Sequence, residues 1–336
     1  MVTIRDIAQA TGVSATTVSN VIHGKDNRVS AETIQKINHA IQELGYVPNM
    51  SARSLVSSSS KVIGFVNHTM TRNNVNVMED PFHSAAIGAI EATLHENGYY
   101  LMLRTVETAE ELVTFLQNWN VAGLFFTGIF KDKFFDSMSG LNIPVVLIDS
   151  YVHTPQFCNV GLEDFTGSYD ATRYLIEKGH RHIAFASPNI KDGGVLQERF
   201  LGYKAALAEN SIPFDKNIVF QQEMDLASCK LVSDEITKHP EITGLVVTAD
   251  IMAAGIMTGL RSHGIRIPDD ISIVGFDDIN IAQLVTPPLT TIRQDMNLKG
   301  RLAVDFMLQL LNGTHLDTTE VTLPTKLIER DSVKSL

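Results

Sequence analysis

The spacing of hydrophobic residues changes near residue 60, and the two patterns predict two kinds of structure. From residue 62 onward, short continuous apolar runs alternate with stretches of helical periodicity. This alternation is typical of parallel sheets covered on both faces by helices. The segment is too long for one hydrophobic core, so we expect an α/β fold with two lobes. The runs are Val62–Asn67, Tyr99–Val106, Gly123–Ile129, Pro144–Ser150, His182–Ser187, Asn217–Gln221, Gly244–Ala249 and Ile271–Asp278, and the helical stretches include Ala85–Asn97, Thr166–Lys178 and Arg199–Asn210.

Residues 3–22 have the spacing of two short helices joined by a turn. Gly12 ends the first helix, and the hydroxyl of Ser14 can cap the second. The inward positions are Ile4, Ile7 and Ala8 in the first helix and Val18, Val21 and Ile22 in the second. The outward positions of the second helix are Ala15, Thr16, Ser19 and Asn20. Such short side chains suit a helix lying in the major groove of DNA. Periodicity alone leaves open a helical hairpin whose outer face meets only water.

A third helix is predicted between Ser30 and Gly45. Glu32 complements the positive end of its dipole, and Gly45 is the expected stop. Its buried stripe comprises Ile34, Ile37, Ile41 and Leu44. Three helices in under fifty residues are enough for a small DNA-binding head.

The charge of the chain is unevenly distributed. The net charge is −11, which by itself argues against binding to nucleic acid. Residues 1–61 have six Lys and Arg against four Asp and Glu, so this segment carries +2 and the remainder −13. This distribution suits a protein in which only the head meets DNA. We see no apolar run long enough for a membrane span and no secretory signal, so we expect a cytoplasmic protein without membrane contact.

Polar side chains recur where the apolar runs end. In open α/β sheets, ligands bind beyond the carboxyl ends of the strands, and two lobes would place two such rows across a cleft. Each carboxylate taken singly could equally be a capping or solvated loop residue. The polar ends are Asn67, Asp149–Ser150, Ser187, Thr248 to Asp250, and Asp277–Asp278.

Signatures of catalysis and of cofactor binding are missing from the sequence. It contains no phosphate-binding loop, no dinucleotide fingerprint after the first strand and no nucleophile elbow. His180 and His182 invite a metal reading, but their spacing favours a helix cap and a surface residue. We expect Cys158 and Cys229 to be small core residues and Trp119 to pack in the core. No metal, cofactor or enzymatic activity is predicted.

Several segments together resemble the LacI/GalR family of bacterial transcription regulators. In the head these are Val13-Ser-Ala-Thr-Thr-Val-Ser, Val29-Ser and Leu44-Gly-Tyr-Val-Pro-Asn. In the body they are Tyr174-Leu-Ile-Glu-Lys-Gly-His-Arg-His-Ile, Arg199-Phe-Leu-Gly-Tyr, Ala249-Asp-Ile-Met-Ala-Ala-Gly, Ile267-Pro-Asp-Asp-Ile-Ser-Ile-Val-Gly-Phe-Asp-Asp and Pro288-Leu-Thr-Thr-Ile. The resemblance covers essentially the whole chain and implies a sensor fold similar to periplasmic sugar-binding proteins.

The resemblance divides the chain into a helix-turn-helix head (1–47), a hinge helix with linker (48–61) and a two-lobed sensor (62–336). Lobe 1 would comprise about 62–160 and 293–320, and lobe 2 about 161–292 and 321–330. From the residues alone, the hinge could be a plain linker. The family pattern makes it a helix that enters the minor groove, where Leu55 would wedge between base steps. The implied DNA contacts are Thr3, Ser14, Ala15, Thr16, Thr17, Ser19, Asn20, Asn49, Ala52, Arg53 and Leu55.

The resemblance also implies effector contacts in the sensor. The best candidates are Arg199, Asp250 and Asp277, with Phe82 as an apolar wall and Asp149, Ser150 and Met224 as weaker candidates. Two features depart from the family. The loop from Thr69 to Pro81 is longer than usual, and Leu162-Glu163 replaces a common Asp-Asn pair.

The expected function is that of a transcription regulator, most simply a repressor. A homodimer would bind a pseudo-palindromic operator, and a small molecule between the lobes would change its DNA affinity. A sugar is the first expectation for that effector and a nucleobase the second. Two alternatives belong to other classes, namely a solute-binding protein of a transport system and an α/β enzyme acting on the same ligand.

Overall fold

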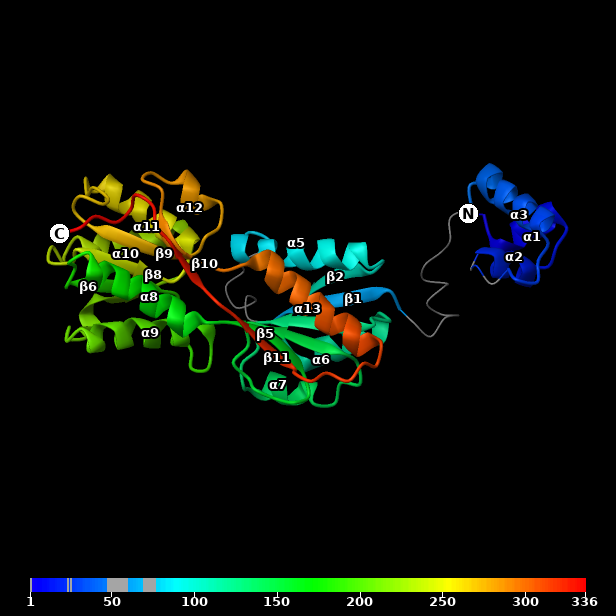
Figure 1. Ribbon diagram of the computed structural model, residues 1–336, viewed down its shortest axis with the longest axis horizontal. Coiled ribbons are helices and arrows are strands. Elements are labelled where there is room, and N and C mark those ends of the chain that lie inside the picture. Colours follow the sequence, from blue (N-terminus) through cyan, green and yellow to red (C-terminus); the bar gives the residue numbers. More distant parts are fainter. Residues whose placement is uncertain (1, 23, 25, 47–59, 69–76) are drawn as a thin grey trace. The chain divides into compact units, whose positions relative to one another are not determined.

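Figure 1 presents the computed structural model of the chain, which describes residues 2–22, 24, 26–46, 60–68 and 77–336. The chain divides into two compact units, Met1–Ser60 and Lys61–Leu336. The predicted hinge residues Asn49, Ala52, Arg53 and Leu55, and residues 69–76 of the long loop, lie outside the described residues.

The first unit contains three helices, α1 (Ile4–Thr11), α2 (Ala15–Ile22) and α3 (Ala31–Leu44). Each helix begins where the sequence offers a capping hydroxyl. Thr3 and Asp6 form a reciprocal capping box on α1, and Ser30 accepts a hydrogen bond from the amide of Thr33 at the start of α3. The chain leaves α1 and α3 at glycines in the left-handed region. The small core between the helices consists of Ile7, Val18, Val21, Ile37 and Ala40.

The first lobe of the second unit is built on a six-stranded sheet with the order β11-β5-β4-β3-β1-β2. All its pairings are parallel. Helices α5 and α13 pack against each other over one face, and α6 and α7 cover the other (Figure 1). The elements are β1 (Val62–Asn67), α5 (Pro81–Glu96), β2 (Tyr100–Thr105), α6 (Ala109–Asn118), β3 (Gly123–Thr127), α7 (Lys133–Met138), β4 (Val145–Ile148), β5 (Cys158–Leu162), α13 (Met296–Leu311) and β11 (Glu320–Leu323).

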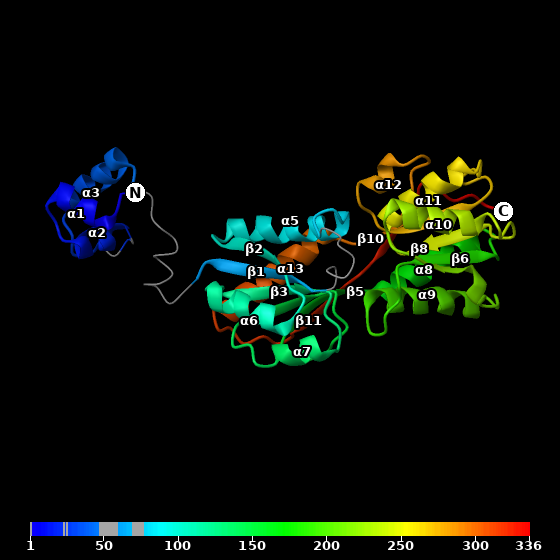
Figure 2. The same ribbon diagram turned by 180° about the vertical axis from the view of Figure 1, so that it is seen from behind.

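The second lobe repeats this plan with the order β12-β10-β9-β8-β6-β7, in which only β12 is antiparallel to its neighbour. Helices α8 and α9 lie together on one side of the sheet, and α10 and α11 on the other (Figure 2). The elements are α8 (Asp164–Glu177), β6 (Ile183–Ser187), α9 (Val195–Glu209), a 3-10 helix (Lys216–Ile218), β7 (Val219–Gln221), α10 (Leu226–Ile236), β8 (Gly244–Val247), α11 (Asp250–Ser262), β9 (Ser272–Asp277), α12 (Ile281–Leu284), β10 (Thr290–Arg293) and β12 (Lys326–Ile328). The predicted fold class, a helical head with a two-lobed parallel α/β sensor, is confirmed.

Between residues 77 and 336 the chain crosses from one lobe to the other three times. The crossings follow β5, β10 and β11. The sequence placed the lobe boundaries at 160 and 320, which is a few residues too early. Strands β5 and β11 pair as far as Leu162 and Leu323, so both strand ends belong to the first sheet. Hydrogen bonding between segments far apart in the chain sets these boundaries, and the apolar pattern alone does not report it.

One packing expectation is wrong, and the expectations for the histidines and cysteines are confirmed. Trp119 follows the end of α6 and is 53% exposed, so it is not a core residue. His182 is exposed, as expected. His180 lies just beyond the end of α8, where its backbone amide donates to the Leu175 carbonyl at 3.1 Å as the expected helix cap, and its side chain is fully buried. Its Nδ1 pairs with the Thr243 hydroxyl at 3.0 Å, and its Nε2 donates to the Lys334 carbonyl at 3.1 Å. Cys158 and Cys229 are buried, as predicted.

Because His180 fastens the C-terminal segment, stability should depend on its protonation. Burial lowers the pKa of His180 below its ordinary value of 6.5. The folded state therefore resists protonation of His180. The stability that the neutral side chain contributes is fully present above pH 6.5, the ordinary pKa, and is lost as the pH falls through the lowered pKa of the folded state. We expect the melting temperature of wild type to exceed that of His180→Asn at pH 7.5 and to lose most of this advantage at pH 5. An equal difference at both pH values would contradict this, and exposed His95→Asn serves as the control.

Candidate ligand cleft and nucleic-acid interface

The second helix of the head turns its candidate DNA contacts outward. Val18 and Val21 anchor α2 in the core, while Ala15 and Thr16 are exposed. The remaining candidates on this helix, Thr17, Ser19 and Asn20, are half-buried. A helix held from one side, with short side chains on the other, can enter the major groove without steric conflict.

Two other head candidates serve local structure as well. Ser14 accepts a hydrogen bond from the amide of Thr17 at 3.1 Å, and Thr3 caps α1. Both residues remain exposed, so their helix-capping roles leave room for contacts with a phosphate backbone. The structure brings all head candidates onto α1, α2 and the turn between them.

In the sensor, both sheets end in buried polar groups without partners. Asn67 and Thr127 are register partners at the carboxyl ends of β1 and β3. Ser187 and Thr248 lie one position beyond the paired Ala186 and Val247 of β6 and β8. Their side-chain oxygens, and the amide nitrogen of Asn67, have no hydrogen-bond partner among the residues that the structure describes. Buried polar groups are almost always paired, so four orphans at strand ends indicate a place for a ligand or water.

A buried guanidinium stands beside the orphan groups of the second lobe. Arg199 on α9 is 7% exposed and donates to Asp164 at 2.8 Å and to the Thr248 carbonyl at 2.5 Å. The central carbon of the guanidinium, Cζ, lies 3.6 Å from the centroid of the Phe276 ring, and Nη1 lies 3.8 Å from Oδ1 of Asp277. The phenol of Tyr151, from the loop after β4, donates to the other oxygen of Asp164 at 2.8 Å. Arg199 is therefore held rigidly between carboxylates at the junction of the lobes.

A second buried cation approaches from the first lobe. Lys299 on α13 is 1% exposed, and its ammonium contacts both oxygens of Asp149 at 2.6 and 2.7 Å. It also donates to Oε1 of Gln294 at 2.9 Å, and the other end of that amide donates to Asp277 at 2.6 Å. The ring of Phe82 lies 5.5 Å from the ammonium, so the expected apolar wall borders this charge. Together with Arg199, Asp164 and Tyr151, these residues form one polar ring that involves both lobes.

The electrostatics of the ring are set by burial. Burial raises the pKa of Asp277 to about 7, although the Arg199 guanidinium opposes the shift. Burial, followed by the charge of Asp277, raises the pKa of Asp250 well above its ordinary value. Burial likewise raises the pKa of Asp164 against the influence of Arg199. Because the pKa of Asp277 lies near neutrality, its carboxyl group can both donate and accept hydrogen bonds there, which suits hydroxyl-bearing ligands.

Three of the sequence candidates have internal partners. Asp250 is fully buried, accepts from the Thr291 hydroxyl at 2.6 Å and from the Ile279 amide at 3.0 Å, and so supports the loop after β9. The Ser150 hydroxyl donates to the Ile129 carbonyl at 3.3 Å and accepts from the Val152 amide at 3.2 Å. Met224 packs against the core of the second lobe. Their geometry favours supporting roles behind Arg199, Asp277, Asp149 and Phe82.

Backbone strain gathers at the same strand ends. Asp149, Asp277 and Asp278 are non-glycine residues with φ of 52°, 111° and 57°. Such conformations cost energy and persist where surrounding contacts enforce them, often at ligand sites. Asp278 is held by Arg293 and Arg330, which fixes the turn that presents Asp277.

Sequence reasoning missed four members of the ring: Tyr151, Asp164, Gln294 and Lys299. One of them left a usable signal. Lys299 occupies the buried stripe of α13 together with Ala303 and Phe306, and a charge on an apolar stripe is unusual. Asp164 follows the Leu162-Glu163 pair that departs from the family pattern. Leu162 is buried in β5 and Glu163 is exposed, so the carboxylate comes from Asp164, one residue later.

Neither a metal-binding cluster nor a membrane-spanning helix is present in the described part of the chain. No group of three or more His, Cys, Asp and Glu side chains is arranged to hold a metal ion there. In the same part of the chain, no helix combines the length and hydrophobicity needed to cross a membrane.

Comparison with known proteins gives matches at both ends of the chain. Residues 3–49 match the family model of bacterial regulatory proteins, lacI family, and residues 172–333 match a periplasmic binding protein-like domain. The chain is 32% identical over 343 residues to the HTH-type transcriptional repressor PurR of Vibrio atlanticus (strain LGP32), and the match covers 100% of both chains.

Solved structures are similar over nearly the whole length. The lac repressor dimer bound to operator and the anti-inducer ONPF has a TM-score of 0.86 at 27% identity and covers 99% of each chain. A complex of the transcriptional regulator CelR with cellobiose has a TM-score of 0.73 at 26% identity and covers 99% of this chain and 100% of that one.

Proposed function

The chain belongs to the lacI family of bacterial regulatory proteins, and we propose that it is a repressor whose affinity for operator DNA is set by a sugar bound between its lobes. It is a DNA-binding transcription regulator with an effector-binding domain, and not an enzyme. A regulator of this kind acts on the chromosome, so we place it in the cytoplasm.

The observation that carries the sugar proposal is the set of unpaired groups at the strand ends. Asn67, Thr127, Ser187 and Thr248 provide an amide and three hydroxyls from two sheets, beside the buried Arg199 and Asp277. A polyol can satisfy such groups through paired donors and acceptors. The similar CelR structure contains cellobiose, which supports the same ligand class here. A nucleobase is the second candidate, because the half-buried Phe82 ring could stack on it.

The head, the hinge and the two lobes have separate roles in this proposal. We propose that Thr16, Asn20 and their neighbours on α2 read bases, that the 48–61 segment acts as hinge, and that Arg199, Asp277, Asp149 and Phe82 contact the effector. Ligand binding would change the relation of the lobes and, through linkage, the affinity for DNA.

The test is a mobility-shift titration of the full chain on DNA from its own upstream region, repeated across a salt series and with a panel of ligands. The proposal predicts sequence-dependent binding that one ligand alters, while non-specific DNA competes poorly. A thermal-shift screen over cellobiose, D-ribose, sugar phosphates and purines identifies the ligand, since a compound that binds only the folded state raises the melting temperature. Binding that ignores DNA sequence would contradict the function, and a shift with purines alone would favour the nucleobase.

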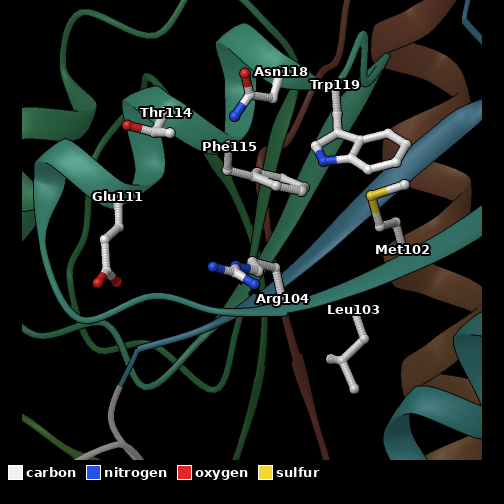
Figure 3. Close-up of a pocket in the computed structure, with 8 residues that line it drawn as sticks. All are labelled: Met102, Leu103, Arg104, Glu111, Thr114, Phe115, Asn118 and Trp119. Carbon is white, nitrogen blue, oxygen red and sulfur yellow. The ribbon is translucent and has the colours of Figure 1, made fainter.

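A homodimer is the proposed assembly, in keeping with the dimeric lac repressor structure. Strand β2 is the last strand of its sheet, and an open strand edge favours pairing with another chain. Large apolar side chains are exposed on β2 and α6, including Tyr100 at 59% and Trp119 at 53%. Between these elements lies a pocket of about 460 Å³, in which Met102, Arg104, Phe115 and Trp119 face one another (Figure 3). We propose that a second copy covers this surface.

Charges on this surface should therefore weaken dimerisation. We expect Leu103→Glu combined with Trp119→Glu to raise the dimer dissociation constant at least tenfold, because two buried apolar contacts become unpaired charges. Sedimentation equilibrium of the full chain measures the constant. The exposed pair Phe214→Glu and Leu336→Glu, which lies in the second lobe, is the control. Equal effects of the two pairs of substitutions on the dissociation constant would show that the dimer interface does not lie on β2 and α6.

A further inference from the structure

Lys299 is the least expected member of the polar ring. Lysines are almost never fully buried unless they are paired. This one is 1% exposed and stands on α13 of the first lobe. Its ammonium is saturated by the two oxygens of Asp149 at 2.6 and 2.7 Å and by Oε1 of Gln294 at 2.9 Å. The contact with Asp149 is enough to neutralise its carboxylate, so the additional bond from Lys299 to Gln294 requires a separate explanation.

Gln294 lies in the crossover between the lobes. Strand β10 ends at Arg293 in the second sheet, and Asp295 caps α13 in the first lobe. The side-chain amide has a fixed orientation, because its nitrogen donates to Asp277 at 2.6 Å while its oxygen accepts from Lys299. The backbone amide of Gln294 also donates to the Asp277 carbonyl at 3.4 Å. The crossover residue is thus held between a carboxyl group of one lobe and an ammonium group of the other.

We propose that Lys299 is a positioning residue that couples occupancy of the cleft to the crossover between the lobes, acting through Gln294 and Asp277. The inference rests on the proposed function, since it takes the cleft as the effector site. An effector hydroxyl that binds Asp277 competes with Gln294 for that carboxyl group, and one that binds Asp149 competes with Lys299. Loss of either partner frees the crossover to change its conformation, so the ligand acts directly on the segment that joins the lobes.

The simpler alternative is that Lys299 only neutralises the partly buried carboxylate of Asp149, and two variants separate the roles. Lys299→Met removes the ammonium partner of this carboxylate and should lower the melting temperature markedly. The double variant Lys299→Met/Asp149→Asn removes both charges and should recover most of that loss. In neither variant does Gln294 have an ammonium donor. Exposed Lys133→Met, also in the first lobe, is the matched control.

The first measurement needs no ligand. Hydrogen exchange of the full chain should be at least tenfold faster in the peptide containing residues 293–299 of the double variant than in wild type. Peptides from α10 should exchange at the wild-type rate. Wild-type exchange across the crossover in the double variant would overturn the proposal, because the link would then have no effect on the segment it is said to hold.

The second measurement compares operator affinity with and without the compound that gives the largest thermal shift among cellobiose, D-ribose and adenine. At ligand concentrations that saturate each protein, so that any loss of the Asp149 contact to the ligand is compensated, we expect the ligand-induced change in operator affinity to fall at least tenfold in the double variant, while Lys133→Met retains it. A full response in the double variant would overturn the coupling role. If wild type shows specific operator binding but no response to any of the three compounds, the proposed effector class fails, and the exchange result alone decides the role of Lys299.

Discussion

Replacing Arg199 with Met is expected to abolish the effector response and to lower the free energy of unfolding by about 3–5 kcal/mol. The guanidinium is the partner of Asp164 at 2.8 Å and lies 3.8 Å from Asp277, and all three side chains are buried. Its removal leaves two buried carboxyl groups without their counter-charge. It also removes the donor to the Thr248 carbonyl and thereby disturbs the strand end beside the orphan hydroxyl. Urea unfolding gives the stability, and calorimetric titration gives the effector affinity.

Two controls define what this result means. Arg266→Met breaks an exposed ion pair with Asp270 and should change stability by less than about 1 kcal/mol. Arg199→Lys keeps the charge but cannot bridge Asp164 and the Thr248 carbonyl with planar geometry, so it should recover part of the stability and little of the effector affinity. A stable Arg199→Met variant with wild-type effector binding would show that Arg199 does not belong to the ligand site.

The second large effect is expected in the head. If Asn20 reads a base edge, Asn20→Ala should weaken operator binding by about 1–3 kcal/mol, or roughly 5- to 150-fold. Val18 and Val21 of the same helix carry its packing, so the melting temperature of the head should barely change. Quantitative mobility shift on the operator and on a scrambled sequence measures the loss, which should be confined to the operator.

Asn38→Ala provides the matched control for Asn20. Asn38 is exposed on α3, so its removal should leave operator affinity within experimental error. Effector binding to the sensor should be unchanged in both variants. Equal weakening on operator and scrambled DNA in Asn20→Ala would assign this residue to the phosphate backbone instead of a base.

Local features of the sequence determined the elements and the broad architecture. The apolar run Val62–Asn67 is the strand β1 to the residue, and the capping residues Thr3 and Ser30 begin α1 and α3 where the pattern predicts. These features depend on neighbours within a few positions, because strand and helix periodicity and capping hydrogen bonds are local. Family resemblance added the helix-turn-helix and selected Arg199 and Asp277 as candidates, and the structure then showed that both are buried and lie 3.8 Å apart.

The chemistry of the cleft was decided by contacts between distant segments. Lys299 meets Asp149 across 150 positions of the chain, and no local pattern announces such a pair. Long-range contacts also decide the role of Asp250. The sequence suggests a ligand contact, but its carboxyl group accepts hydrogen bonds from the Thr291 hydroxyl and the Ile279 amide. Trp119 also illustrates this limit, since a tryptophan is expected in the core but its exposure depends on what packs beside it. Strand order and long-range pairing determine which polar groups are satisfied and which are left without a partner. The sequence therefore indicated a candidate site, and the contacts within it could be assigned only from the tertiary structure.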